Sequence, residues 1–176
     1  MKRIICLFIV LCVTVAAFGQ NKVLRQRMEI SQIEINDGQL TLEVFQMEDN
    51  GQYYLSVGHL GIGDDIIQIN FDPIFELFIP LGGTLAEAVE TLEQLKEFYK
   101  ESPGTSMEMK GCLCAAYPND EWETVTVTSR KFILTKLLEY SVKRDDLIRA
   151  THIPRSDFAS LVGGVKLYQK IHPNEK

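Results

Sequence analysis

The stretch TLAEAVETLEQLKEFYK, residues 84–100, predicts an amphipathic helix and divides the chain into two β-rich parts. Thr84 and Glu87 have the spacing of a capping box, in which each side chain bonds a free backbone N–H at the start of the helix. Ser102-Pro103-Gly104 follows and is typical of a helix end. We therefore expect one face of this helix to pack on a sheet. Its apolar residues at helical spacing are Leu85, Ala88, Val89, Leu92, Leu95, Phe98 and Tyr99.

The residues before this helix have the pattern of strands joined by tight turns. Asp37-Gly38 and Asn50-Gly51 are hairpin signals, because glycine adopts positive φ without a steric penalty. Asp72-Pro73 interrupts the pattern and indicates an edge strand, a bulge or a short excursion. The expected strands cover residues 28–35, 40–47, 53–60, 66–71 and 74–80.

The residues after the helix repeat this organisation. Pro154 precedes a second apolar stripe at helical spacing, which predicts a second amphipathic helix. Gly163-Gly164 inside that helix costs roughly 1 kcal/mol per glycine relative to alanine. The pair therefore indicates either a close approach to another backbone or a kink. The expected strands cover residues 107–117, 122–128, 131–142 and 147–153.

These patterns predict an α+β protein made of antiparallel sheet and two amphipathic helices. Asp64-Asp65 and Asp145-Asp146 occupy similar turns, and an Ile-Pro pair precedes each helix. We therefore expect two related strand-rich units, each followed by one helix. The expected boundaries are residues 20–102 and 103–176, with both units packed as one compact domain. The sequence does not determine whether the two units share a common sheet.

The N-terminus has the three regions of a secretory signal peptide. Lys2 and Arg3 are basic, residues 4–13 are apolar, and Ala17-Phe18-Gly19 ends in small residues. The apolar run is too short for a confident membrane span. Cleavage after Gly19 leaves roughly 155 residues, enough for one domain. We expect an exported protein, in the periplasm or at the exterior of a bacterium.

Charge argues against binding to nucleic acid. The chain has a formal net charge of −6, and the acidic residues dominate before residue 103. Polyanions are repelled by such a protein. Basic residues do cluster after residue 128, with Phe132, Tyr117 and Tyr140 as aromatics able to stack on bases. The expected export and the acidic residues that lie among these basic ones argue against nucleic-acid binding. We therefore expect the aromatic residues to pack in the core. The basic residues are Arg130, Lys131, Lys136, Lys143, Arg144, Arg149 and Arg155.

Cys112 and Cys114 are the cysteines that remain after cleavage of the signal peptide. On a strand they share a face, with Cα atoms about 6.5 to 7 Å apart, near the limit for a disulfide. The favoured interpretation is a pair of small apolar core residues. A strained redox disulfide, with Gly111 allowing a bend, and a metal-ligand pair are the alternatives.

The sequence contains no recognisable catalytic or metal motif. It has neither a Gly-x-Ser-x-Gly elbow nor a His-Glu-x-x-His pattern. His59 and His152 are the candidates for catalysis, and each falls on an expected strand where a structural histidine is commoner. Asp64, Asp65, Asp145 and Asp146 are weak metal candidates, since turn aspartates normally bond local backbone groups and calcium-loop spacing is absent. We expect no cofactor.

These observations favour a non-enzymatic binding or interaction module over an enzyme. The partner is an unidentified protein or small molecule, and no membrane span is expected after the signal peptide. The alternative is a secreted hydrolase with an unrecognised site that contains histidine and aspartate. A histidine and a carboxylate converging in a cleft favour the hydrolase, whereas an exposed apolar surface or an open sheet edge favours binding.

Overall fold

The computed structural model describes residues 26–35, 40–58, 61–62, 75–114, 117–144 and 146–173. The predicted signal peptide and its cleavage site lie outside these residues. The strands are β1 (Arg27–Ile35), β2 (Leu40–Met47), β3 (Tyr53–Val57), β4 (Gly61–Ile62), β5 (Glu76–Gly82), β6 (Ser106–Cys114), β7 (Glu123–Phe132), β8 (Thr135–Arg144) and β9 (Leu147–Pro154). The helices are α2 (Leu85–Phe98) and α3 (Arg155–Ile171).

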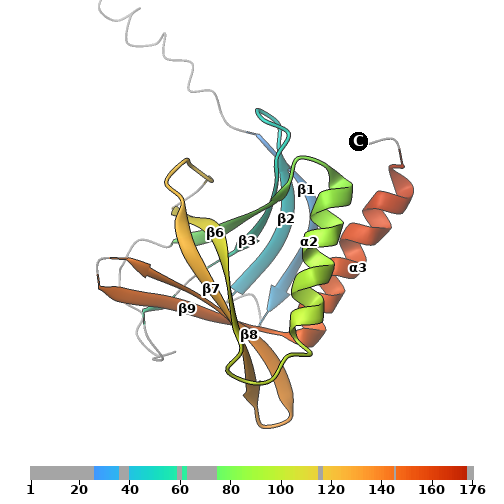
Figure 1. The fold of residues 1–176 in the computed structure, drawn as a ribbon. Coiled ribbons are helices and arrows are strands. Elements are labelled where there is room, and N and C mark those ends of the chain that lie inside the picture. Colours follow the sequence, from blue (N-terminus) through green and yellow to red (C-terminus); the bar gives the residue numbers. More distant parts are fainter. Residues whose placement is uncertain are drawn as a thin grey trace, which may run out of the picture.

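All the described strands belong to one sheet with the order β1-β2-β3-β5-β6-β7-β8-β9-β4. Every neighbouring pair is antiparallel. The helices α2 and α3 lie side by side and cover one side of the sheet, as Figure 1 shows. The main core fills the space between the helices and this face. Because strand side chains alternate between faces, the opposite face carries a separate set of residues.

The predicted division into two related units is wrong. Leu77 of β5 pairs with Leu113 of β6, so the strands before and after α2 form one continuous sheet. The short strand β4 leaves its sequence neighbours and pairs with β9 at the far edge. Helix α3 also packs on β1 and β2, which belong to the first part of the chain. The two parts therefore share one sheet and one main core.

The helix expected over residues 84–100 is found as α2, and its capping box is formed. Thr84 Oγ1 accepts a hydrogen bond from the Glu87 backbone at 3.2 Å, and Glu87 Oε2 accepts one from the Thr84 backbone at 3.1 Å. Leu85, Leu92 and Leu95 are buried in the main core. Local capping and the apolar stripe together explain why this segment could be located from sequence.

Tyr99, at the C-terminal end of α2, connects both helices to the far part of the sheet. Its hydroxyl donates to the Ile153 carbonyl at 3.0 Å, and its ring centroid lies 5.7 Å from that of Phe158 in α3. All three residues are fully buried. Since β9 and α3 follow one another directly, this contact fixes their junction against α2.

The segment expected as one β stretch over residues 131–142 contains a hairpin turn. Strand β7 continues to Phe132, the chain reverses at Ile133 and Leu134, and β8 begins at Thr135. In Figure 1 this β7–β8 hairpin projects past the ends of both helices. The turn lacks glycine, proline, asparagine and aspartate, so the usual turn signals gave no indication of it.

Candidate functional site

The outer face of β6–β9 carries a line of polar residues that we call the polar row: Ser106, Thr128, Glu139 and His152. Ser106 pairs with Thr128, Thr128 with Glu139, and Glu139 with His152. Their neighbours Val127, Leu138 and Ile153 lie in the main core. Alternation along each strand therefore places the polar row on the face away from the helices.

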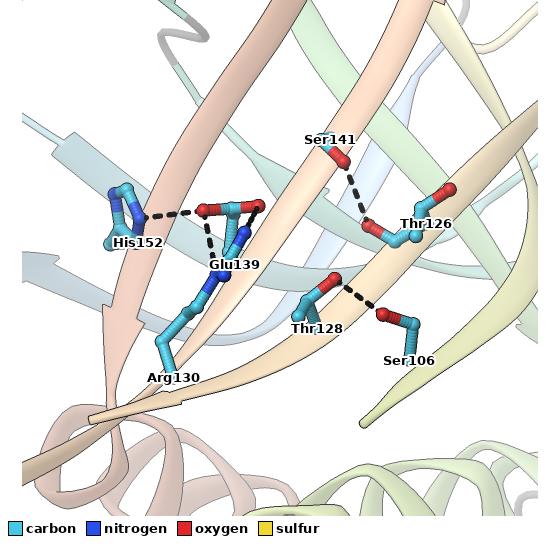
Figure 2. Close-up of polar contacts among 7 residues, drawn as sticks. All are labelled: Ser106, Thr126, Thr128, Arg130, Glu139, Ser141 and His152. Atoms are coloured by element: carbon cyan, nitrogen blue, oxygen red, sulfur yellow. Dashed lines mark hydrogen bonds and ion pairs between the residues drawn. The ribbon is translucent and has the colours of Figure 1, made fainter. Parts of the chain in front are cut away.

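Glu139 is the centre of the polar row. Arg130 donates two hydrogen bonds to its carboxylate, from Nε at 3.2 Å and from Nη2 at 2.9 Å, and His152 Nε2 lies 3.1 Å from Oε2 (Figure 2). Burial opposes ionisation of Glu139, but the hydrogen bonds and charges of Arg130 and His152 prevail and lower its pKa. Glu139 is therefore an ionised carboxylate whose two oxygens are both engaged at neutral pH.

The hydroxyl groups near this centre bond one another or the backbone. Ser106 Oγ and Thr128 Oγ1 lie 2.9 Å apart, and Ser141 Oγ donates to the Thr126 carbonyl at 3.3 Å. Figure 2 shows both pairs directed at each other instead of toward His152. Nucleophilic catalysis needs a hydroxyl within reach of its base, and this arrangement does not provide one. The polar row instead ties adjacent strands together at the base of the β7–β8 hairpin.

A shallow depression next to the polar row gives no further sign of catalysis. Its volume is about 460 Å³, and its lining includes Glu123, Ser141, Lys143 and Ile148. His152 is not part of that lining. A histidine and a carboxylate are thus within hydrogen-bond distance of each other, but they do not converge in this depression.

Of the other histidine and aspartate candidates, only Asp146 lies within the described ranges. His59, Asp64, Asp65 and Asp145 lie outside the described residues. Asp146 occupies a turn with a left-handed φ of 61° and forms an exposed ion pair with Lys143 at 3.4 Å. Among the described ranges, no group of three or more His, Cys, Asp or Glu residues could hold a metal ion.

Cys112 and Cys114 are free thiols on β6, and both are buried. They belong to a small buried cluster on the outer face of the sheet, together with Phe45, Tyr54 and Phe78 among others. Burial, with a smaller contribution from the neighbouring Cys114, raises the pKa of Cys112 to about 12. A thiol of this kind stays protonated near neutral pH and is a poor nucleophile and metal ligand. The geometry agrees with the favoured interpretation of small core residues.

The end of the β7–β8 hairpin is the most exposed apolar feature of the described chain. Phe132, Ile133 and Leu134, which we call the hairpin tip, have exposed fractions of 66%, 75% and 91%. Ile133 has a φ of 54°, a left-handed conformation that is unfavourable for a β-branched residue. Strain of this kind persists only where the surroundings impose it, and it often marks functional segments.

Basic residues flank the hairpin tip. Lys131 and Lys136 pair directly across the hairpin, and Arg130 precedes Lys131. Lys136 Nζ also donates to the backbone carbonyls of Lys100 and Glu101 at 3.2 Å each, which anchors the hairpin to the C-terminal end of α2. The stretch from Arg130 to Leu137 contains three basic residues and no acidic one.

The hairpin tip overturns part of the expectation for the aromatics. Phe132 was expected in the core but is largely exposed, and Tyr117 is 38% exposed. Tyr140 is fully buried in the main core, as expected. The sequence signal for the hairpin tip was a run of three large apolar residues, Phe132 to Leu134, with a lysine close to each end. It was missed because the same run is typical of a buried strand.

Comparison with protein-family models, with curated proteins and with solved structures finds no match for this chain. Among the helices that the structure describes, none is long and apolar enough to cross a bilayer.

Proposed function

We propose that the chain is an exported, non-enzymatic interaction module that engages its partner through the hairpin tip. The observation that carries this proposal is the exposure of Phe132, Ile133 and Leu134 at the end of a hairpin anchored by ionic and hydrogen bonds. Soluble proteins rarely keep large apolar residues together on a projecting segment unless another surface covers them. The signal-peptide pattern of residues 1–19 supports action in the periplasm or at the cell exterior.

The rigid base of the hairpin strengthens this proposal. The bidentate Arg130–Glu139 pair and the contact of Glu139 with His152 join β7, β8 and β9 just below the hairpin tip. A preorganised binding element loses less conformational entropy on association than a flexible one. The polar row therefore supports the hairpin tip as a rigid recognition element.

A secreted hydrolase remains the competing class, and one observation favours it: His152 and Glu139 lie 3.1 Å apart. Three others oppose it. Arg130 occupies the carboxylate, the nearby hydroxyls bond elsewhere, and His152 does not line the adjacent depression. We therefore conclude in favour of binding.

Site-specific photo-crosslinking in the source organism tests the proposal. A benzophenone amino acid replaces Leu134 at the hairpin tip, and, as a matched control, Leu167, which is 58% exposed on α3. We expect irradiation to give discrete adducts, of protein or of lipid, at position 134 and few at position 167. Equal adduct yields at the two positions, or none at position 134, contradict the proposal.

A further inference from the structure

We propose that the partner of the hairpin tip is the interface of an anionic lipid bilayer, into which Phe132, Ile133 and Leu134 insert. This inference rests on the proposed function and names the surface that the interaction module recognises. It involves shallow insertion of a turn and no membrane-spanning segment. Three properties of the hairpin carry it, namely its apolar end, its basic flanks and its small convex shape.

The apolar end has the composition of an interfacial anchor. Phe132, Ile133 and Leu134 are largely exposed to solvent, and Leu134 is 91% exposed. Burial of such side chains among lipid acyl chains removes their apolar surface from water. Ile133, with its left-handed φ of 54°, and Leu134 form the two-residue turn between β7 and β8, so Phe132, Ile133 and Leu134 all lie at the end of the hairpin.

The charges below the apolar end are arranged for contact with anionic headgroups. Lys131 and Lys136 are directly opposite in the β7–β8 register, and like charges in that relation destabilise a sheet. Lys131 is exposed and takes part in no ion pair among the described residues. Glu139, the nearest acidic residue on the hairpin, is already engaged by Arg130. An anionic surface offsets the unfavourable pairing, since each basic residue near such a surface contributes to binding.

The shape of the hairpin favours a bilayer over a protein. A stable protein interface buries about 800 Å² on each partner, which three side chains at the end of a two-stranded hairpin cannot supply. A bilayer accepts a narrow convex element without a preformed pocket. The whole chain has a net charge of −6, so the parts of it outside the basic hairpin are acidic and are repelled by the same surface. We therefore expect contact to be confined to the hairpin.

Vesicle flotation tests this inference with the exported form of the protein. Mass spectrometry first confirms that the apolar N-terminal run is absent, because that run binds lipid by itself. The probes are vesicles of phosphatidylcholine alone and of phosphatidylcholine with one quarter phosphatidylglycerol. We expect binding to the anionic vesicles to exceed binding to the neutral ones several-fold.

Three variants separate the contributions of the apolar end and the charges. The double change Phe132→Ser with Leu134→Ser should weaken binding to anionic vesicles by about tenfold, because it removes the inserting side chains. Lys131→Glu should weaken it by about tenfold as well, because it replaces an attraction by a repulsion. Leu167→Ser removes an apolar residue that is 58% exposed on α3 and should leave binding unchanged. Far-ultraviolet circular dichroism and thermal melting confirm that all three variants fold.

The outcomes distinguish failure of this inference from failure of the proposed function. Absence of vesicle binding, or equal binding by the double variant and the original protein, overturns the bilayer inference. If crosslinks from position 134 are then found on a protein, the interaction module stands with a protein partner. Self-association in sedimentation velocity that the double variant abolishes identifies a second copy as the occupant, and also overturns the bilayer inference. Absence of both crosslinks and vesicle binding contradicts both proposals.

Discussion

Gly164 of α3 packs directly against Ser31 of β1, and a Cβ atom at Gly164 would overlap Ser31 Oγ and lie 3.2 Å from Ser31 Cβ. Ser31 Oγ donates to the Leu161 carbonyl of the same helix at 3.3 Å. The β1–β2 register shifts between Glu29 and Ser31, so the helix meets the strand at an irregularity. This contact accounts for one glycine of the Gly163-Gly164 pair, whereas a Cβ at Gly163 would meet open space.

The two neighbouring glycines should respond oppositely to alanine. Gly163→Ala should stabilise the fold by about 1 kcal/mol, because alanine is the better helix former. Gly164→Ala should destabilise it by about 1 kcal/mol, since overpacking against Ser31 outweighs the same gain. Urea denaturation measures both changes. Adding Ser31→Ala to Gly164→Ala should recover part of the lost unfolding free energy. If the effects of the two substitutions on the unfolding free energy simply add, the contact with Ser31 is not the cause of the loss.

Two buried tyrosines form a second matched pair. Tyr99 donates a hydrogen bond to Ile153, whereas Tyr140 Oη has no hydrogen-bond partner among the described residues. Tyr99→Phe should therefore cost about 1 kcal/mol of unfolding free energy, while Tyr140→Phe should be neutral or stabilising by about 1 kcal/mol. Denaturant titration of both variants checks the difference. Equal losses would mean that the Tyr140 hydroxyl has a partner, such as an ordered water.

Glu139 should make the stability of the fold depend on pH in the acidic range. Its pKa is lower in the folded protein than its ordinary value near 4.5, so the folded state favours the ionised form. The resulting stabilisation is present above the unfolded pKa and is lost as pH falls through the folded pKa. Glu139→Gln should lower the melting temperature at pH 7, and the difference from the original protein should shrink below pH 4. A difference that persists at low pH contradicts this assignment.

Glu43 should have the opposite dependence. Burial raises its pKa despite an ion pair with Arg27 at 3.2 Å, and the nearby Glu29 and Glu76 raise it further. A raised folded pKa means that ionised Glu43 destabilises the fold at neutral pH and that this penalty disappears as pH falls. Glu43→Gln should therefore raise the melting temperature at pH 7 and have less effect at pH 4. Arg27 keeps Glu76 as a partner at 3.8 Å in that variant. A lower melting temperature at pH 7 would falsify this sign.

The two cysteines should be unreactive until the protein unfolds. With Cys112 fully buried and its pKa raised to about 12, a thiol reagent at pH 8 should slowly label folded protein prepared without residues 1–19, which contain Cys6 and Cys12. Denaturation without reductant should release two reactive thiols per chain, and Cys112→Ala should reduce this number to one. Absence of reactive thiols after denaturation would indicate an oxidised pair, contrary to the free thiols of the structure.

Local patterns located most of the regular elements of this fold. The helix starting after Thr84 could be found because its capping box and its apolar stripe act within one segment. The second helix follows Pro154 as expected, with Phe158 and Leu161 in the core. Such signals depend on neighbouring residues alone, so no knowledge of the tertiary structure was needed.

The global arrangement could not be obtained in this way. The similar turns at Asp64-Asp65 and Asp145-Asp146 suggested two units, but pairing of β5 with β6 joins the described strands in one sheet. The displacement of β4 to the edge of β9 depends on contacts between residues far apart in sequence. Repeated turn chemistry reports local geometry and does not report which strands become neighbours.

The candidate site was also only partly accessible from the sequence. His152 was singled out, but its partners Glu139 and Arg130 come from other strands and emerge only from the register. The hairpin tip could not be recognised from the sequence, because Ile133 adopts in its turn a conformation that glycine or asparagine usually adopts. The apolar residues of the hairpin tip predict a buried segment from the sequence, and only the three-dimensional structure shows that they are exposed.

Tyr168 of α3 donates a hydrogen bond to the sulfur of Met28 in β1, across 140 positions of the chain. The first strand is thus covered by the last helix. The chain emerges from a ribosome or a translocation channel with its N-terminus first. Strand β1 therefore cannot form its native contacts with α3 until that helix has emerged as well. The apolar strands of the chain then remain accessible to holding chaperones until α3 has been synthesised or transferred. This topology favours a late, all-at-once maturation over stepwise folding from the N-terminus.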